Sequence, residues 1–100
     1  RRIEASREDE GDAITLRFDT PHVVGAIVLE EDIAQGQRID EAVVTASIDG
    51  DGEQEIARVH CVGYRRIVTL EKPVTATQVR VTVTKSRQGF YLADCFAIEA

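Results

Sequence analysis

Hydrophobic and polar residues alternate along much of this chain, and a period of two residues is typical of β-strands with one buried face. The clearest case is the segment Gln78 to Thr84, in which Val79, Val81 and Val83 are separated by polar residues. No segment shows a helical period. We expect seven strands at intervals of about ten residues, at 14–18, 23–29, 38–48, 54–59, 65–70, 78–84 and 90–98.

Segments rich in glycine, proline and aspartate separate these strands. Asp49-Gly50-Asp51-Gly52 is a strong hairpin signal, and Asp19-Thr20-Pro21 and Glu71-Lys72-Pro73 indicate further turns. Residues 23–29 are apolar nearly throughout, which predicts a central strand buried on both faces. Gly25 within it indicates a bulge or a close backbone approach. The pattern therefore predicts an all-β fold, an antiparallel β-sandwich.

Alternation within each strand also predicts which residues form the core, because every second side chain points to the same face. The expected core residues are Ile14, Leu16, Val24, Ala26, Val28, Val44, Ala46, Ile48, Ile56, Ile67, Val79, Val81, Val83, Leu92, Phe96 and Ile98.

Length and charge narrow the picture further. One hundred residues are enough for one domain, and the charge-dense residues 1–12 are expected to be a tail or linker remnant before a sandwich at 13–100. A net charge of −6 argues against nucleic acid or an anionic membrane as partner, since both attract basic surfaces. No stretch approaches the ~20 apolar residues of a membrane span.

The residues that could carry catalysis or bind a metal do not form a recognisable constellation. His22 and His60 have no partner at ligand spacing, so structural roles are expected and no metal or cofactor is predicted. The carboxylate pairs Glu30-Glu31 and Asp49-Asp51 lie in polar loops, where solvent keeps both groups ionised, unlike the pair of a glycosidase. We expect no catalytic residues in this chain.

Cys61 and Cys95 are the two cysteines, and they could form one disulfide. Their spacing has no disulfide-framework or C-x-x-C character, so two free thiols are the favoured interpretation.

Two short segments differ from the regular strand pattern: residues 31–39, EDIAQGQRI, and residues 62–67, VGYRRI. Each has a glycine followed by arginine and a β-branched residue, which suits a tight loop that opens a strand. They resemble the patterns E-x-I-x-x-G-Q-R-(V/I) and I-G-(Y/H)-(K/R)-R-I of the discoidin-like β-sandwich that follows the catalytic barrel in glycoside hydrolase family 29 α-L-fucosidases. Residues 76–81, ATQVRV, are similar to a strand of discoidin-type sandwiches.

The resemblance implies a jelly roll of the discoidin, galactose-binding-like type. It also implies a non-catalytic accessory domain that buttresses the catalytic barrel of an α-L-fucosidase and lies at the edge of its cleft. The barrel would be the partner of this domain and would itself hydrolyse the α-L-fucoside. The alternative is a carbohydrate-binding module that recognises galactosides or fucosylated glycans, and a third class is a self-associating module. A flat, partly apolar flank favours the buttress, whereas an exposed tyrosine beside two arginines in a concave pocket favours glycan binding.

Polar and aromatic residues beside the glycine loops are the candidate ligand-binding or domain-interface residues: Glu31, Gln37, Arg38, Tyr64, Arg65, Arg66 and Arg87. A structural interpretation pairs Arg38 with Glu31 across their own loop and is favoured for these two residues. We also expect the loops around Gly36 and Gly63 to lie at the same end of the sandwich and to touch.

Overall fold

The computed structural model describes residues 1–31, 39–48, 51–60, 62–63, 65–87 and 92–100. Over these ranges the chain forms strands and no helix. The strands are β1 (Ser6–Glu10), β2 (Ala13–Glu31), β3 (Ile39–Ile48), β4 (Asp51–His60), β5 (Arg66–Ser86) and β6 (Leu92–Glu99). No helix within the described part of the chain is long and apolar enough to cross a membrane.

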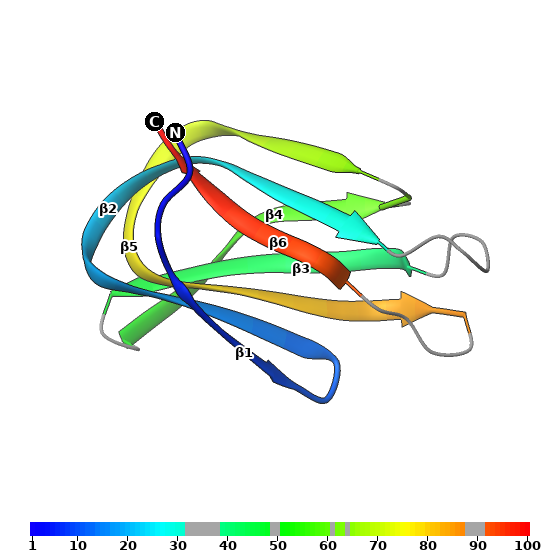
Figure 1. Ribbon diagram of the computed structural model, residues 1–100. Helices are drawn as coiled ribbons and strands as arrows, with labels where there is room; N and C mark the ends of the chain where they lie inside the picture. Colours follow the sequence, from blue (N-terminus) through cyan, green and yellow to red (C-terminus); the bar gives the residue numbers. More distant parts are fainter. Residues whose placement is uncertain (32–38, 49–50, 61, 64, 88–91) are drawn as a thin grey trace.

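All strand pairs are antiparallel, and two long strands, β2 and β5, belong to both layers of a sandwich (Figure 1). The first half of β2 pairs with the second half of β5, from Ala13 opposite Thr82 to Arg17 opposite Gln78. This layer also contains β1, β3 and β4. The second half of β2 pairs with the first half of β5 and with β6, which gives the second layer. The predicted antiparallel β-sandwich is therefore confirmed.

Two of the predicted turns were wrong. Residues 19–21 lie within β2 and residues 71–73 lie within β5, so four expected strands are halves of two continuous ones. The chain bends there instead of reversing: the β2–β5 register shifts between Arg17 and His22, and residues 70–73 have no partner on β2. A proline, which has no N–H for the ladder, is tolerated in such an unpaired stretch. By contrast, the predicted hairpin between β3 and β4 is confirmed by their pairing down to Ile48 opposite Asp51.

The first twelve residues are also more ordered than their charge suggested. Residues 6–10 form β1 against β2, and Ile3 is only 2% exposed. The Ile3 N–H donates to the Ala97 carbonyl at 2.8 Å, which holds this segment beside β6. The expectation of a tail without structure is therefore corrected. The five residues of β1 are exposed overall, as suits a charged edge strand.

The core lies between the two layers, and all but one of the expected residues of the five-stranded layer are in it or packed against it. Ile14, Leu16, Val44, Ala46, Val79, Val81 and Val83 are buried, as are Val24 and Leu92, and Ile56 packs against them. The core also contains residues that the alternation did not single out: Ile3, Phe18, Ile39, Ala42, Val59, Val62 and Ala76.

In the three-stranded layer the predicted register was wrong by one residue, except at Val24 and Leu92, which lie in the core as predicted. Ile67 is 56% exposed, while Ala26, Phe96 and Ile98 are only partly buried; Ile27, Leu29, Leu70, Cys95 and Ala97 occupy the core instead. Ile48, at the end of β3, is also exposed, at 46%.

Gly25 explains part of this error. Val24 faces the core, but the pairing of β2 with both β5 and β6 shifts between Val24 and Ala26, so the alternation changes face there. A Cβ atom on Gly25 would lie 2.8 Å from the Cα of Ala100. The expected bulge and close backbone approach at Gly25 are both confirmed.

Candidate functional site

The two segments that stood out in the sequence meet at one end of the sandwich. The end of β2, the start of β3, the end of β4 and the start of β5 all lie at the right of Figure 1. The Glu31 N–H donates to the Gly63 carbonyl, and the Val62 N–H donates to the Ile39 carbonyl, both at 3.3 Å. These flanking residues lie together, as expected, and Arg38 and Tyr64 themselves lie outside the described residues.

Glu31 joins the two segments through a buried carboxylate. Glu31 is 2% exposed. Its two carboxylate oxygens accept hydrogen bonds from the backbone N–H groups of Ile39, at 2.9 Å, and Gly63, at 3.0 Å. Hydrogen bonds to a carboxylate are stronger than neutral ones, and they offset the cost of burying its charge. Glu31 thus contacts its own domain and holds in place the start of β3 and Gly63, which lies between β4 and β5.

The other candidate residues in the described ranges do not converge on one pocket. Arg65 forms an ion pair with Glu30, with Nε and Oε2 3.2 Å apart, and Arg87 lies 3.9 Å from Asp40. Arg66 is exposed opposite Leu29. Gln37, Arg38 and Tyr64 lie outside the described residues, so the predicted Glu31–Arg38 pair and the aromatic contact of Tyr64 stay predictions.

Arg65 borders an apolar surface whose residues were predicted to lie in the core. Val28 lies opposite Ile67 of β5 on one side and opposite Phe96 of β6 on the other, and Ala26 lies opposite Ile98. We call Ala26, Val28, Ile67, Phe96 and Ile98 the outer flank. Val28 is fully buried and yet is not part of the core cluster, which contains its neighbours Ile27 and Leu29. The flank therefore lies on the outside of the three-stranded layer.

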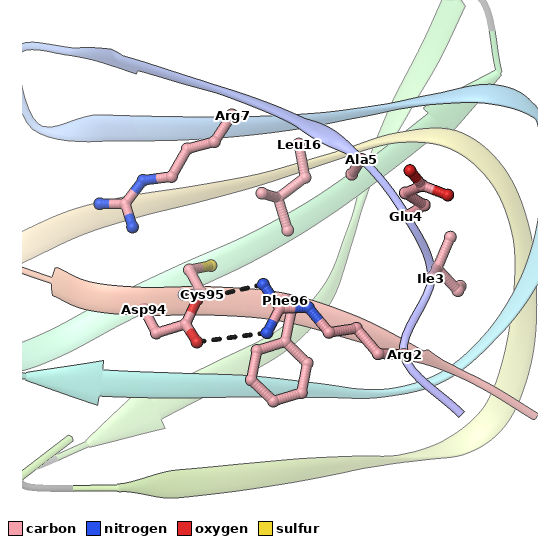
Figure 2. Close-up of a pocket in the computed structure, with 9 residues that line it drawn as sticks. All are labelled: Arg2, Ile3, Glu4, Ala5, Arg7, Leu16, Asp94, Cys95 and Phe96. Carbon is pink, nitrogen blue, oxygen red and sulfur yellow. Dashed lines mark hydrogen bonds and ion pairs between the residues drawn. The ribbon is translucent and has the colours of Figure 1, made fainter.

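Charged residues next to the flank are paired within the domain. The Arg2 guanidinium carbon lies 4.2 Å from the centroid of the Phe96 ring, and the same guanidinium donates to both carboxylate oxygens of Asp94 at 3.4 Å (Figure 2). A cation over an aromatic face is an attractive arrangement. Arg2 thereby attaches the N-terminal segment to the border of the flank.

A cavity of about 150 Å³ lies beside this contact, between the N-terminal segment and β6 (Figure 2). Arg7 lines it and donates to the Leu92 carbonyl at 2.7 Å. The Cys95 thiol also lines it, and burial raises the pKa of that thiol to about 12. A neutral thiol is a poor nucleophile, so Cys95 does not provide covalent chemistry at neutral pH. Cys95 is free, in agreement with the expectation, and Cys61 lies outside the described residues.

A second buried carboxylate, Glu41, was not among the residues predicted from the sequence. It is 8% exposed and accepts hydrogen bonds from the Thr84 hydroxyl at 2.6 Å and from Arg58 at 3.2 Å, while His60 Nε2 lies 3.1 Å from Oε2. The Thr84 hydrogen bond is the main cause of the lowered pKa of Glu41, and Lys85, Arg58 and His60 act in the same direction. Only the register of β3 against β4 and β5 brings these residues together.

This cluster joins three strands and accounts for His60 as a structural residue. His22, in turn, packs edge-on against Phe18 with ring centroids 5.7 Å apart. Among the described residues, no three His, Cys, Asp or Glu side chains are grouped in a way that could hold a metal ion.

Comparison with known proteins gives the fold a context. No protein-family model and no curated protein matches the chain. Among solved structures, a Bacteroides thetaiotaomicron protein described as an alpha-L-fucosidase matches 100% of this chain with 26% identity and a TM-score of 0.87. SpGH29 matches 95% of it with 32% identity and a TM-score of 0.80. The family 32 carbohydrate-binding module of Streptococcus pneumoniae EndoD matches 88% of it with 18% identity and a TM-score of 0.73.

The matched regions differ in how much of each relative they represent. This chain spans 22% of the Bacteroides protein and 21% of SpGH29, but 69% of the carbohydrate-binding module. The similarity to the glycosidases is therefore confined to a small part of their length, whereas the similarity to the carbohydrate-binding module extends over most of that module. The chain is a discoidin-like, galactose-binding-like β-sandwich domain of the kind found within glycoside hydrolase family 29 α-L-fucosidases.

Proposed function

We propose that this domain is a non-catalytic accessory module of an α-L-fucosidase chain and that it supports the catalytic domain. The match of the whole chain to about a fifth of a fucosidase-like protein, with a TM-score of 0.87, carries this proposal. Hydrolysis of the α-L-fucoside is assigned to the remaining part of the parent chain, which would contain the barrel.

The carboxylates described above support a structural role for this module. A retaining or inverting glycosidase needs two carboxyl groups that face a common space, one of them with a raised pKa. Glu31 instead accepts two backbone N–H groups, and the pKa of Glu41 is lowered. Both carboxylates stabilise the fold.

A chromogenic α-L-fucoside tests the proposal directly. The isolated domain should release no chromophore, and the full-length parent chain should hydrolyse the substrate. Turnover by the isolated domain, or the absence of turnover by the full-length chain under conditions in which it is folded, would contradict the assignment.

The alternative, a carbohydrate-binding module for galactosides or fucosylated glycans, is supported by the similarity to the EndoD module. The described arginines weigh against it, because Arg65 and Arg87 are paired with separate carboxylates and do not form one polar pocket. A sugar site normally combines aromatic stacking with converging hydrogen bonds.

Calorimetric titration of the isolated domain with fucose and galactose, followed by a glycan array, separates the two functions. The accessory role predicts no micromolar affinity for either sugar. Micromolar binding that is lost in Tyr64→Ala and Arg65→Ala variants would favour the carbohydrate-binding module.

A further inference from the structure

The two layers of the sandwich have very different outer faces. On the five-stranded layer, one row across the strands consists of Thr15, Arg80, Thr45 and Glu55, and Arg80 also pairs with Glu53 at 3.4 Å. The corresponding row on the three-stranded layer is Ile67, Val28 and Phe96. Antiparallel sheets usually place polar residues on a solvated face, so the first layer has the ordinary pattern and the second does not.

We infer that the outer flank is the surface on which the adjacent domain of the parent glycosidase chain packs, an inference that rests on the proposed function. Its centre is apolar, with Ile67 56% exposed and Val28 already closed off beneath its neighbours. At its border, Arg65 is paired with Glu30 and Arg2 with Asp94. An apolar centre beside a polar rim is the usual anatomy of a protein interface.

Two observations favour an adjacent domain over a second copy of this chain. The matched relatives have most of their length outside this domain, which covers 22% and 21% of them, so in those proteins the domain shares its polypeptide with a much larger part. Of the five residues of the outer flank, only Ile67 is exposed. A stable complex of separate proteins usually buries about 800 Å² on each partner, whereas tethered domains pack through smaller surfaces because the linker keeps their effective concentration high.

Hydroxyl-radical footprinting with mass spectrometry tests the inference on the native side chains. Oxidation of Ile67 and Phe96 should fall several-fold in the full-length parent chain relative to the isolated domain. Ile48 is the matched control, because it is 46% exposed and lies on β3 in the other layer. Equal oxidation of Ile67 in the two proteins would overturn the inference, even if the full-length chain hydrolyses fucosides.

A pair of variants provides a second readout. Ile67→Asp and Ile48→Asp both change exposed side chains, so the isolated domain should stay folded in each. In the full-length chain, Ile67→Asp should separate the melting of this domain from that of its neighbour and accelerate proteolysis between them, and Ile48→Asp should not. Identical behaviour of the two variants would contradict docking through the flank.

Sedimentation velocity shows whether an adjacent domain or a second copy of the chain covers the outer flank. Protection of Ile67 in a monomeric full-length chain supports the adjacent domain. Protection that appears only in dimers would assign the flank to a second copy and overturn the proposed occupant. The hydrolysis assay on the same sample reports separately on the proposed function, so the failure of one can be told from the failure of the other.

Discussion

Glu31 and Glu41 show how single residues hold this sandwich together. Both are glutamates in strands, both are less than a tenth exposed, and both accept hydrogen bonds from donors in other segments of the chain. Their partners differ: Glu31 binds backbone N–H groups, and Glu41 binds the side chains of Thr84 and Arg58. The sequence motif identified Glu31 but not Glu41, because the donors to Glu41 come from positions that only strand register makes adjacent.

Replacing Glu31 should be far more costly than replacing the residue beside it. Glu31→Ala leaves the N–H groups of Ile39 and Gly63 without this acceptor, which should lower the free energy of unfolding by about 2–4 kcal/mol. Glu30→Ala is the control, since its half-exposed ion pair with Arg65 contributes less than about 1 kcal/mol. Urea denaturation monitored by circular dichroism measures both. Equal losses in the two variants would show that Glu31 does not join the segments.

The lowered pKa of Glu41 predicts a specific acid sensitivity. A carboxyl group whose pKa is lower in the folded state contributes stability above its unfolded pKa, near 4.5, and this contribution is lost as the pH falls through the folded value. Below pH 4.5 the native chain should therefore lose stability more steeply than Glu41→Gln.

Thr84→Val tests the cause, because the Thr84 hydroxyl is the strongest contributor to the lowered pKa. This variant should shift the acid transition of Glu41 towards higher pH. Unfolding free energies measured between pH 3 and 7 for the three proteins check both expectations, and parallel curves for native chain and Glu41→Gln would refute the assignment.

At the level of elements, the long strands β2 and β5 determine which side chains are buried. Each passes through both layers, and the register shift at Gly25 changes the face to which alternate residues of β2 point. Residues 24–28 are apolar on both faces of the strand, so no hydrophobic–polar alternation marks this change of face in the sequence. The sequence therefore predicted a strand here correctly but could not predict which of its faces lies in the core.

Matched isoleucines measure this register. Ile27 is fully buried, so Ile27→Ala should cost about 2–5 kcal/mol of unfolding free energy. Ile67 is 56% exposed in the isolated domain, so Ile67→Ala should cost much less than Ile27→Ala. Thermal and urea unfolding of the isolated domain compare the two. A larger loss of unfolding free energy for Ile67→Ala than for Ile27→Ala would support the register predicted from the alternation, in which Ile67 is buried.

For the whole molecule, the N-terminal segment closes one side of the sandwich. Ile3 lies in the core cluster, the N–H of Glu99 donates to the Arg1 carbonyl at 2.8 Å, and Arg2 lies over Phe96. The segment also covers the cavity that contains the Cys95 thiol (Figure 2). The charged composition of residues 1–12 did not indicate this role, because a single isoleucine among charged residues is a weak sign of a buried segment.

Removing residues 1–5 should therefore destabilise the domain and expose Cys95. In a Cys61→Ser background, the intact chain should react slowly with a thiol reagent at pH 8, since burial raises the pKa of Cys95 to about 12. The truncated chain should react faster under the same conditions and unfold at a lower temperature. An unchanged rate and midpoint would show that the segment does not protect the thiol.

The sequence by itself determined the class of fold, the β3–β4 hairpin, the bulge at Gly25 and the likeness to fucosidase domains, because these depend on local alternation, turn residues and short motifs. Only the tertiary structure decided that β2 and β5 bend through both layers, that residues 6–10 form an edge strand, and that Ile67 and Phe96 face outward. It also brought Glu41 to Thr84 and Arg58. The physical reason is that alternation fixes the relative orientation of neighbouring side chains within a strand, whereas pairing between distant strands decides which face meets the core.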